Sequence, residues 1–61
     1  MTIKLITDWL ISYYETGYLS YNEIRNDRIL FKIRRYFPRV NPKEAEEARE
    51  RAIMYIERTT V

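Results

Sequence analysis

Apolar residues recur every three or four positions in the first sixteen residues, which is the spacing of one face of an α-helix. The recurring positions are Ile3, Ile6, Trp9, Leu10, Tyr13 and Tyr14. Polar residues stand opposite them, among them Lys4, Asp8, Ser12 and Glu15. Gly17, the single glycine of the chain, follows directly, and glycine tolerates the left-handed conformation in which many helices end. The pattern predicts an amphipathic helix from Thr2 to Thr16.

A second helical start follows at Ser20. Ser20 and Glu23 stand three residues apart, so that the Ser hydroxyl and the Glu carboxylate can each accept from the other residue's backbone amide in a capping box. Leu19 and Ile24 would form the hydrophobic staple that accompanies such a start. We therefore expect a helix to begin immediately after Ser20.

The continuity of this second helical segment is open. The segment runs toward Tyr36 and is expected to end there, because Pro38 disfavours the helical conformation in Phe37, the residue before it. Asn26 and Asp27 could cap a separate helix that begins at Arg28, since two apolar residues lie off the apolar stripe of the segment. The stripe consists of Ile29, Leu30, Ile33, Tyr36 and Phe37, and the two residues off it are Ile24 and Phe31.

The last helix is predicted to begin at Asn41-Pro42-Lys43-Glu44, where Asn can cap, Pro suits the first helical position and Glu can complete the cap. Its expected inward face carries Ala45, Ala48, Ala52, Tyr55, Ile56 and Thr59. The three alanines would allow another helix to approach closely. Glu47 and Arg51 stand at the spacing of an ion pair on the outer face.

These elements predict an all-α fold, a compact bundle of three helices, or of four if the second is divided, in a single domain over residues 1–61. At 61 residues the chain is near the lower size limit for unaided folding. It contains no Cys and no His, which excludes a disulfide and the usual zinc ligands as stabilising devices. Because 46% of its residues are hydrophobic, a packed core is nevertheless expected.

No apolar run approaches the roughly 18 residues of a membrane span. Asp8 interrupts the stretch from Ile3 to Ile11 and no small-residue cleavage site follows, which argues against a secretory signal. We expect a soluble, cytoplasmic protein without a membrane partner. The basic amphipathic segment from Arg28 to Phe37 could lie on an anionic membrane, but its apolar face is needed for the core.

Charge is distributed unevenly along the chain. The net charge is only +2, yet residues 25–43 carry seven Arg and Lys residues against a single acid, Asp27. The segments on either side are both net acidic. On one continuous helix, four of these cations would share an arc of roughly 80° and form a lateral ridge. The four are Arg25, Arg28, Lys32 and Arg35.

Such a ridge is typical of a surface that grips phosphates. Arginine predominates, and its planar fork suits bidentate pairing with phosphate or with a guanine edge. The sequence thus favours a small nucleic-acid-binding regulator, with the site formed by Arg25, Arg28, Lys32, Arg35, Arg39 and Lys43. The alternative is that glutamates of the last helix neutralise these cations, within the monomer or across a dimer.

The ten residues from Glu15 to Ile24 resemble the opening of many helix-turn-helix regulators, in which a helix ends at Gly and a Ser-capped helix begins. The segment from Ile24 to Ile33 is about two residues shorter than the common spacing of that family, so we do not assign the chain to it. The resemblance would place the segment from Arg28 to Tyr36 in the major groove of DNA.

Six tyrosines are many for this length, and four of them lie near the first turn. Tyr13 and Tyr14 are expected to complete the core, whereas Tyr18 and Tyr21 would be free to contact a partner. The competing function is therefore a protein-interaction module, such as an inhibitor or adaptor, with an interface formed by Tyr18, Tyr21, Ile24 and Phe31. A homodimer could also cover the apolar residues that lie outside the helical stripes, which include Ile11 and Met54.

Catalysis is not expected. The chain has no His for acid-base work, no Cys nucleophile and no Gly-rich phosphate loop. Four glutamates of the last helix could suggest a hard-metal site, but their spacing is typical of a solvated face. They are Glu44, Glu46, Glu47 and Glu50. We expect no metal, no cofactor and no small-molecule substrate.

Overall fold

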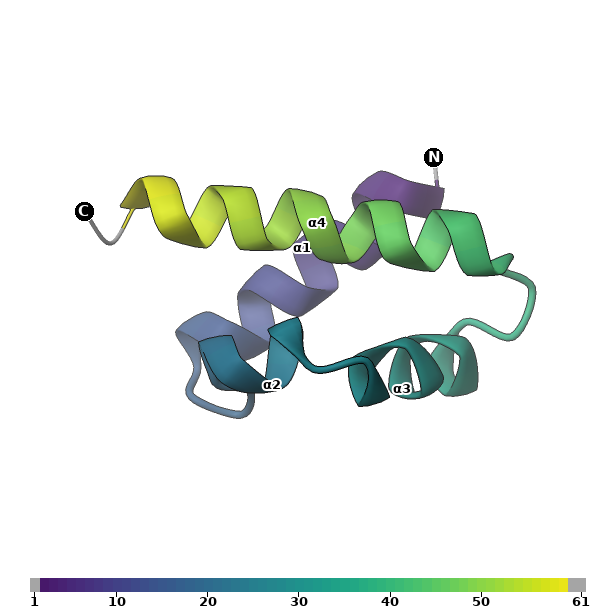
Figure 1. The fold of residues 1–61 in the computed structure, drawn as a ribbon, viewed down its shortest axis with the longest axis horizontal. Helices are drawn as coiled ribbons and strands as arrows, with labels where there is room; N and C mark the ends of the chain where they lie inside the picture. Colours follow the sequence, from purple (N-terminus) through teal and green to yellow (C-terminus); the bar gives the residue numbers. More distant parts are fainter. Residues whose placement is uncertain (1, 60–61) are drawn as a thin grey trace.

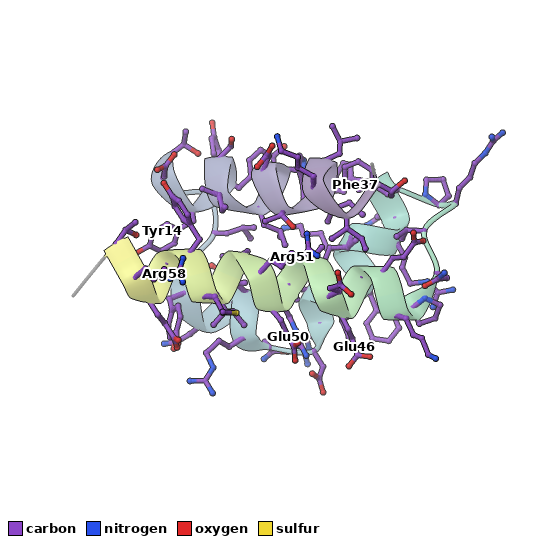
Figure 2. The ribbon with its side chains drawn as sticks, turned by 90° about the horizontal axis from the view of Figure 1, so that it is seen from above. Tyr14, Phe37, Glu46, Glu50, Arg51 and Arg58 are labelled. Carbon is purple, nitrogen blue, oxygen red and sulfur yellow. The ribbon has the colours of Figure 1, made fainter. Side chains whose placement is uncertain are left out.

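The computed structural model describes residues 2–59, which form four helices: α1 (Thr2–Glu15), α2 (Tyr21–Arg25), α3 (Arg28–Tyr36) and α4 (Pro42–Thr59). Helices α1 and α4 lie side by side and run in the same general direction (Figures 1 and 2). The short helices α2 and α3 form a second layer, along which the chain returns to the start of α4 (Figure 1). The all-α prediction is confirmed, in its four-helix form.

The break between α2 and α3 lies at Asn26, whose backbone is extended (φ −77°, ψ 138°). The Asn26 side-chain oxygen accepts a hydrogen bond from the Arg28 backbone amide at 2.9 Å. Asp27 makes no side-chain capping bond, so Asn26 alone caps the start of α3. A side chain that bonds its own backbone two residues on favours a turn over a continuous helix, and this bond stabilises the break.

The other predicted helix ends are confirmed. The Glu23 amide donates to the Ser20 hydroxyl at 3.2 Å and the Ser20 amide donates to the Glu23 carboxylate at 3.0 Å. Asn41 and Glu44 form the same reciprocal pair at the start of α4, at 2.8 and 3.2 Å. Gly17 has a positive φ of 86°, which lets the chain turn back after α1.

The core lies between the two layers and is made of aliphatic side chains from every helix. Its buried members are Ile6, Leu10, Leu19, Ile24, Ile29, Ile33, Val40, Ala45, Ala48, Ala52 and Ile56. The alanines of α4 form part of its packing surface, as predicted. The Thr7 hydroxyl donates to the Ile3 carbonyl at 2.7 Å and lies 3.4 Å from the Ala48 carbonyl oxygen, which shows how closely α1 and α4 approach.

Three side-chain placements differ from the sequence expectation, those of Tyr55, Thr59 and Tyr36. Tyr55 and Thr59 were predicted to face inward but are exposed, because the inward stripe of α4 continues from Ala52 to Ile56. Ile11 is half-buried and packs against the core, while Met54 is exposed. Tyr36, predicted on the inner stripe, is exposed as well. In the described part of the chain, no helix is both long enough and apolar enough to cross a membrane.

Candidate functional site

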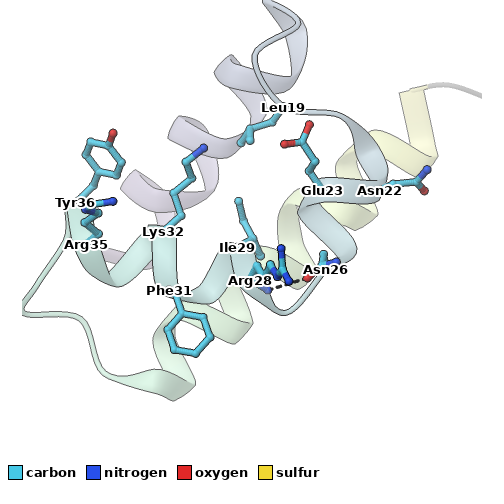
Figure 3. A pocket seen from close by; sticks show the side chains of 10 residues that line it. All are labelled: Leu19, Asn22, Glu23, Asn26, Arg28, Ile29, Phe31, Lys32, Arg35 and Tyr36. Atoms are coloured by element: carbon cyan, nitrogen blue, oxygen red, sulfur yellow. Dashed lines mark hydrogen bonds between the residues drawn. The ribbon is translucent and has the colours of Figure 1, made fainter.

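A shallow groove of about 540 Å³ lies between α2 and α3. Its walls come from both helices, and Leu19 and Ile29, both almost fully buried, contribute to its lining. Figure 3 shows the ten residues that line it: Leu19, Asn22, Glu23, Asn26, Arg28, Ile29, Phe31, Lys32, Arg35 and Tyr36. The groove exists because the chain breaks at Asn26, which separates α2 from α3.

Three cations line the α3 side of the groove. Arg28, Lys32 and Arg35 follow one another at helical spacings of four and three residues, which confines them to an arc of about 60°. All three side chains are exposed, and none forms an ion pair with any residue between 2 and 59. We refer to Arg28, Lys32 and Arg35 as the basic stripe.

Two exposed aromatic rings flank the basic stripe. Phe31 is 74% exposed and Tyr36 is 58% exposed. The Tyr36 ring contacts the Trp9 ring, with centroids 5.4 Å apart and planes inclined at 47°. Trp9 in turn contacts the rings of Tyr13 at 4.9 Å and Phe37 at 5.4 Å. Tyr36 is thus an anchored ring with one exposed side, whereas Phe31 projects into solvent (Figure 3).

Two polar residues on the α2 side of the groove, Glu23 and Asn26, already accept hydrogen bonds from backbone amides. The Glu23 carboxylate accepts from the Ser20 amide, and the Asn26 side-chain oxygen accepts from the Arg28 amide. Glu23 is the only acid among the lining residues of this groove. The basic stripe therefore outnumbers it three to one, and the groove presents a positive field to a ligand.

A second hollow of about 420 Å³ lies on the other side of Phe31, between α3 and α4. Its charged lining residues are Arg34, Asp27 and Glu46, so acids outnumber cations there. Asp27 is also paired with Arg49 of α4, at 2.9 Å. Because Arg49 neutralises Asp27, Arg34 and Glu46 are left to balance each other in the second hollow, and the first groove attracts an anionic ligand more strongly.

The predicted ridge is not continuous. Arg25 belongs to the separate helix α2, and its guanidinium lies 5.7 Å from the centroid of the Tyr21 ring, in cation–π range. Arg39 lies in the connection between α3 and α4, and Lys43 in the first turn of α4; both are exposed. Of the six predicted cations, the structure brings only Arg28, Lys32 and Arg35 together around the groove. The single-helix arc of four was wrong because the helix is divided.

The predicted partner interface is also divided. Tyr18 is 76% exposed and Phe31 is exposed, as expected. Ile24 is fully buried in the core and offers no surface to a partner. Tyr21 is half-buried, packs against the core and donates a hydrogen bond from its hydroxyl to the Glu57 carboxylate, so it is not free. The break at Asn26 separates Ile24 from Phe31, which a one-helix description had placed together.

Of the four glutamates considered for a metal, Glu46, Glu47 and Glu50 are exposed, whereas Glu44 is half-buried and accepts a hydrogen bond from the Asn41 amide. Glu46 and Glu50 project on the side away from α1 (Figure 2), and Glu47 pairs with Arg51 at 2.8 Å, as its spacing predicted. Residues 2–59 contain no group of three or more acids, His or Cys placed to hold a metal ion.

Sequence reasoning missed Tyr36 as a site residue and missed the groove itself. The available signal for Tyr36 was its place in the last turn of α3, two residues before Pro38, where a helix leaves the core. No family model, curated protein or solved structure matches the chain.

Proposed function

We propose that this protein is a small, non-enzymatic nucleic-acid-binding domain that grips phosphates through the exposed face of α3, in a regulatory role. One observation carries the proposal: Arg28, Lys32 and Arg35 are aligned, exposed and free of ion pairs in the described part of the chain. Aligned, unneutralised cations bind phosphates by releasing counterions and by charge-assisted hydrogen bonds.

Each acidic residue that forms an ion pair in the described chain pairs with a cation outside the basic stripe. Asp8 pairs with Lys4, Asp27 with Arg49, and Glu47 with Arg51. Within the monomer the basic stripe therefore keeps its charge for a partner, which weighs against the alternative in which α4 neutralises it. Two of the three side chains are arginines, whose fork can hold one phosphate with two hydrogen bonds.

Binding is tested by fluorescence anisotropy with labelled DNA and RNA, single-stranded and duplex, at about 50 mM salt. If three phosphates are contacted, raising the salt to about 200 mM should weaken binding roughly 20- to 40-fold. The double variant Arg28→Glu, Arg35→Glu should abolish binding while the far-ultraviolet circular dichroism stays unchanged.

Arg58 provides the matched control, because it is exposed on α4 and does not line the groove. The variant Arg58→Glu should retain most of the affinity. Undetectable binding of every nucleic acid to the wild-type chain at low salt would overturn the proposal. The single variant Arg28→Glu changes the net charge by the same amount as Arg58→Glu, and equal loss in these two would show that net charge, and not the stripe, governs binding.

A protein-docking surface is the second candidate, favoured by the exposure of Phe31 beside two hollows. Apolar contacts are not screened by salt as phosphate contacts are. A stoichiometric partner that stays bound through nuclease treatment and high salt, and is lost in Phe31→Ala, would favour this candidate.

A further inference from the structure

The two exposed rings of α3 lie on opposite flanks of the basic stripe. At about 100° per residue, Phe31 lies roughly 40° beyond Arg35 on one side, and Tyr36 roughly 40° beyond Lys32 on the other. The rings are five residues apart, which is about 7.5 Å along the helix axis. In Figure 3 the Phe31 and Tyr36 side chains leave α3 in different directions, and the Lys32 side chain extends away from Phe31.

An aromatic ring that is exposed beside cations matches the chemistry of an unpaired base. In an unpaired nucleotide the apolar face of the base can stack on an aromatic ring, while the phosphate of the same nucleotide pairs with an adjacent guanidinium or ammonium group. In a duplex the base faces are covered by their neighbours, so Phe31 and Tyr36 would find no stacking partner there. Stacking is worth about 1–3 kcal/mol per base, so this difference is large enough to decide which form binds.

We infer that the exposed face of α3 selects single-stranded nucleic acid, with one base stacked on Phe31, a second on Tyr36, and the intervening phosphates on the basic stripe. This inference rests on the proposed function and specifies its substrate. The contact with Trp9 restrains the Tyr36 ring before the strand binds, so this ring loses little freedom on binding.

The charge of the two hollows beside Phe31 fixes the side on which the strand lies. The groove between α2 and α3 carries the basic stripe against Glu23 alone, whereas the second hollow carries Asp27 and Glu46 against Arg34. Since Asp27 is neutralised by Arg49, the second hollow has no net charge, and a polyanion is attracted to the first. The strand therefore follows the groove from Phe31 toward Tyr36.

The test compares the affinity of labelled single strands of about 12 nucleotides, DNA and RNA, with that of the matching duplexes. We expect the wild-type chain to prefer the single strands. Phe31→Ala should weaken single-strand binding about tenfold and leave the weaker duplex binding unchanged, since one stacked base is lost. Phe31→Trp should restore the affinity.

Met54→Ala is the control, because Met54 is an exposed apolar residue of α4 that lies outside the groove; it should leave the affinity unchanged. A strand that carries a fluorescent purine analogue reports stacking directly. Its emission should be quenched by the wild-type chain and less so by Phe31→Ala.

Three outcomes would overturn the inference in distinguishable ways. A preference for duplex, with Phe31→Ala equal to Met54→Ala, would leave nucleic-acid binding intact and remove the stacking sites. Absence of all binding would overturn the proposed function as well. A free protein that sediments as a dimer and becomes monomeric in Phe31→Ala would show that a second copy, and not a base, covers the ring.

Discussion

The Arg49 guanidinium of α4 lies 2.9 Å from the carboxylate of Asp27, the residue that immediately precedes α3. The Arg49 side chain is only 14% exposed, and within the described chain its Nε is buried without a hydrogen-bond partner. A nearly buried cation with a single anionic partner depends strongly on that partner. The contact therefore links the position of α3, and of its basic stripe, to α4.

Removing the anion should destabilise the fold. We expect Asp27→Ala to lower the free energy of unfolding by about 1 kcal/mol, because Arg49 then lacks its acceptor, although water reaches the exposed Asp27 side and limits the loss. Urea denaturation measures the change. The exposed pair of Lys4 and Asp8, 3.6 Å apart, provides the control: Asp8→Ala should change stability by no more than about 0.5 kcal/mol. Equal effects in the two variants would contradict the special dependence of Arg49.

The helix ends could be predicted from sequence because each is decided within four residues. Ser20 with Glu23, and Asn41 with Glu44, form the expected reciprocal bonds. Gly17 has the expected positive φ. The identity and order of the elements, and the alanine face of α4, follow from these local signals and from the helical period of the apolar residues.

The candidate site could not be predicted in the same way, because it depends on how two short helices are oriented. A helix break at Asn26 and a continuous helix through Asn26 have similar local free energies, so tertiary packing decides between them. Once the break forms, Ile24 turns into the core while Phe31 stays outside. The sequence pattern identifies both as lying off the apolar stripe, and only the expected staple of Ile24 with Leu19 indicated that Ile24 would be buried.

The contact of α1 with α4 depends on small side chains. Ala48 is fully buried, and its carbonyl oxygen lies 3.4 Å from the Thr7 hydroxyl of α1. A larger side chain there has no space, so Ala48→Leu should cost about 1–3 kcal/mol of stability through overpacking. The melting temperature measures the loss. Glu50→Leu, at an exposed position of the same helix, should be tolerated; a similar loss in both variants would contradict the overpacking argument.

The turn after α1 requires the left-handed conformation of Gly17. A Cβ at Gly17 would meet no atom within 4 Å, so any cost of substitution is conformational and not steric. We expect Gly17→Ala to lower stability by about 1 kcal/mol and Gly17→Asn by less, since Asn tolerates positive φ better than Ala. Thermal unfolding of both variants checks the order, and an Ala variant as stable as the wild type would show that the turn can adopt another conformation.

Tyr21 should make stability depend on pH in the alkaline range. The hydrogen bond to the Glu57 carboxylate raises the pKa of the Tyr21 phenol, and burial raises it further. A pKa above its unfolded value of about 10 means that the folded state holds the proton more tightly. The resulting stabilisation is complete below about pH 10 and is lost as the pH rises through the folded pKa. Urea denaturation at a series of pH values should therefore show that the stability advantage of the wild type over Tyr21→Phe shrinks above about pH 10.

Glu57→Gln should remove the same pH-dependent part of the stability, because it removes the negative acceptor of the Tyr21 hydrogen bond. An advantage of the wild type over Tyr21→Phe that stays constant across this pH range would contradict the role of that hydrogen bond.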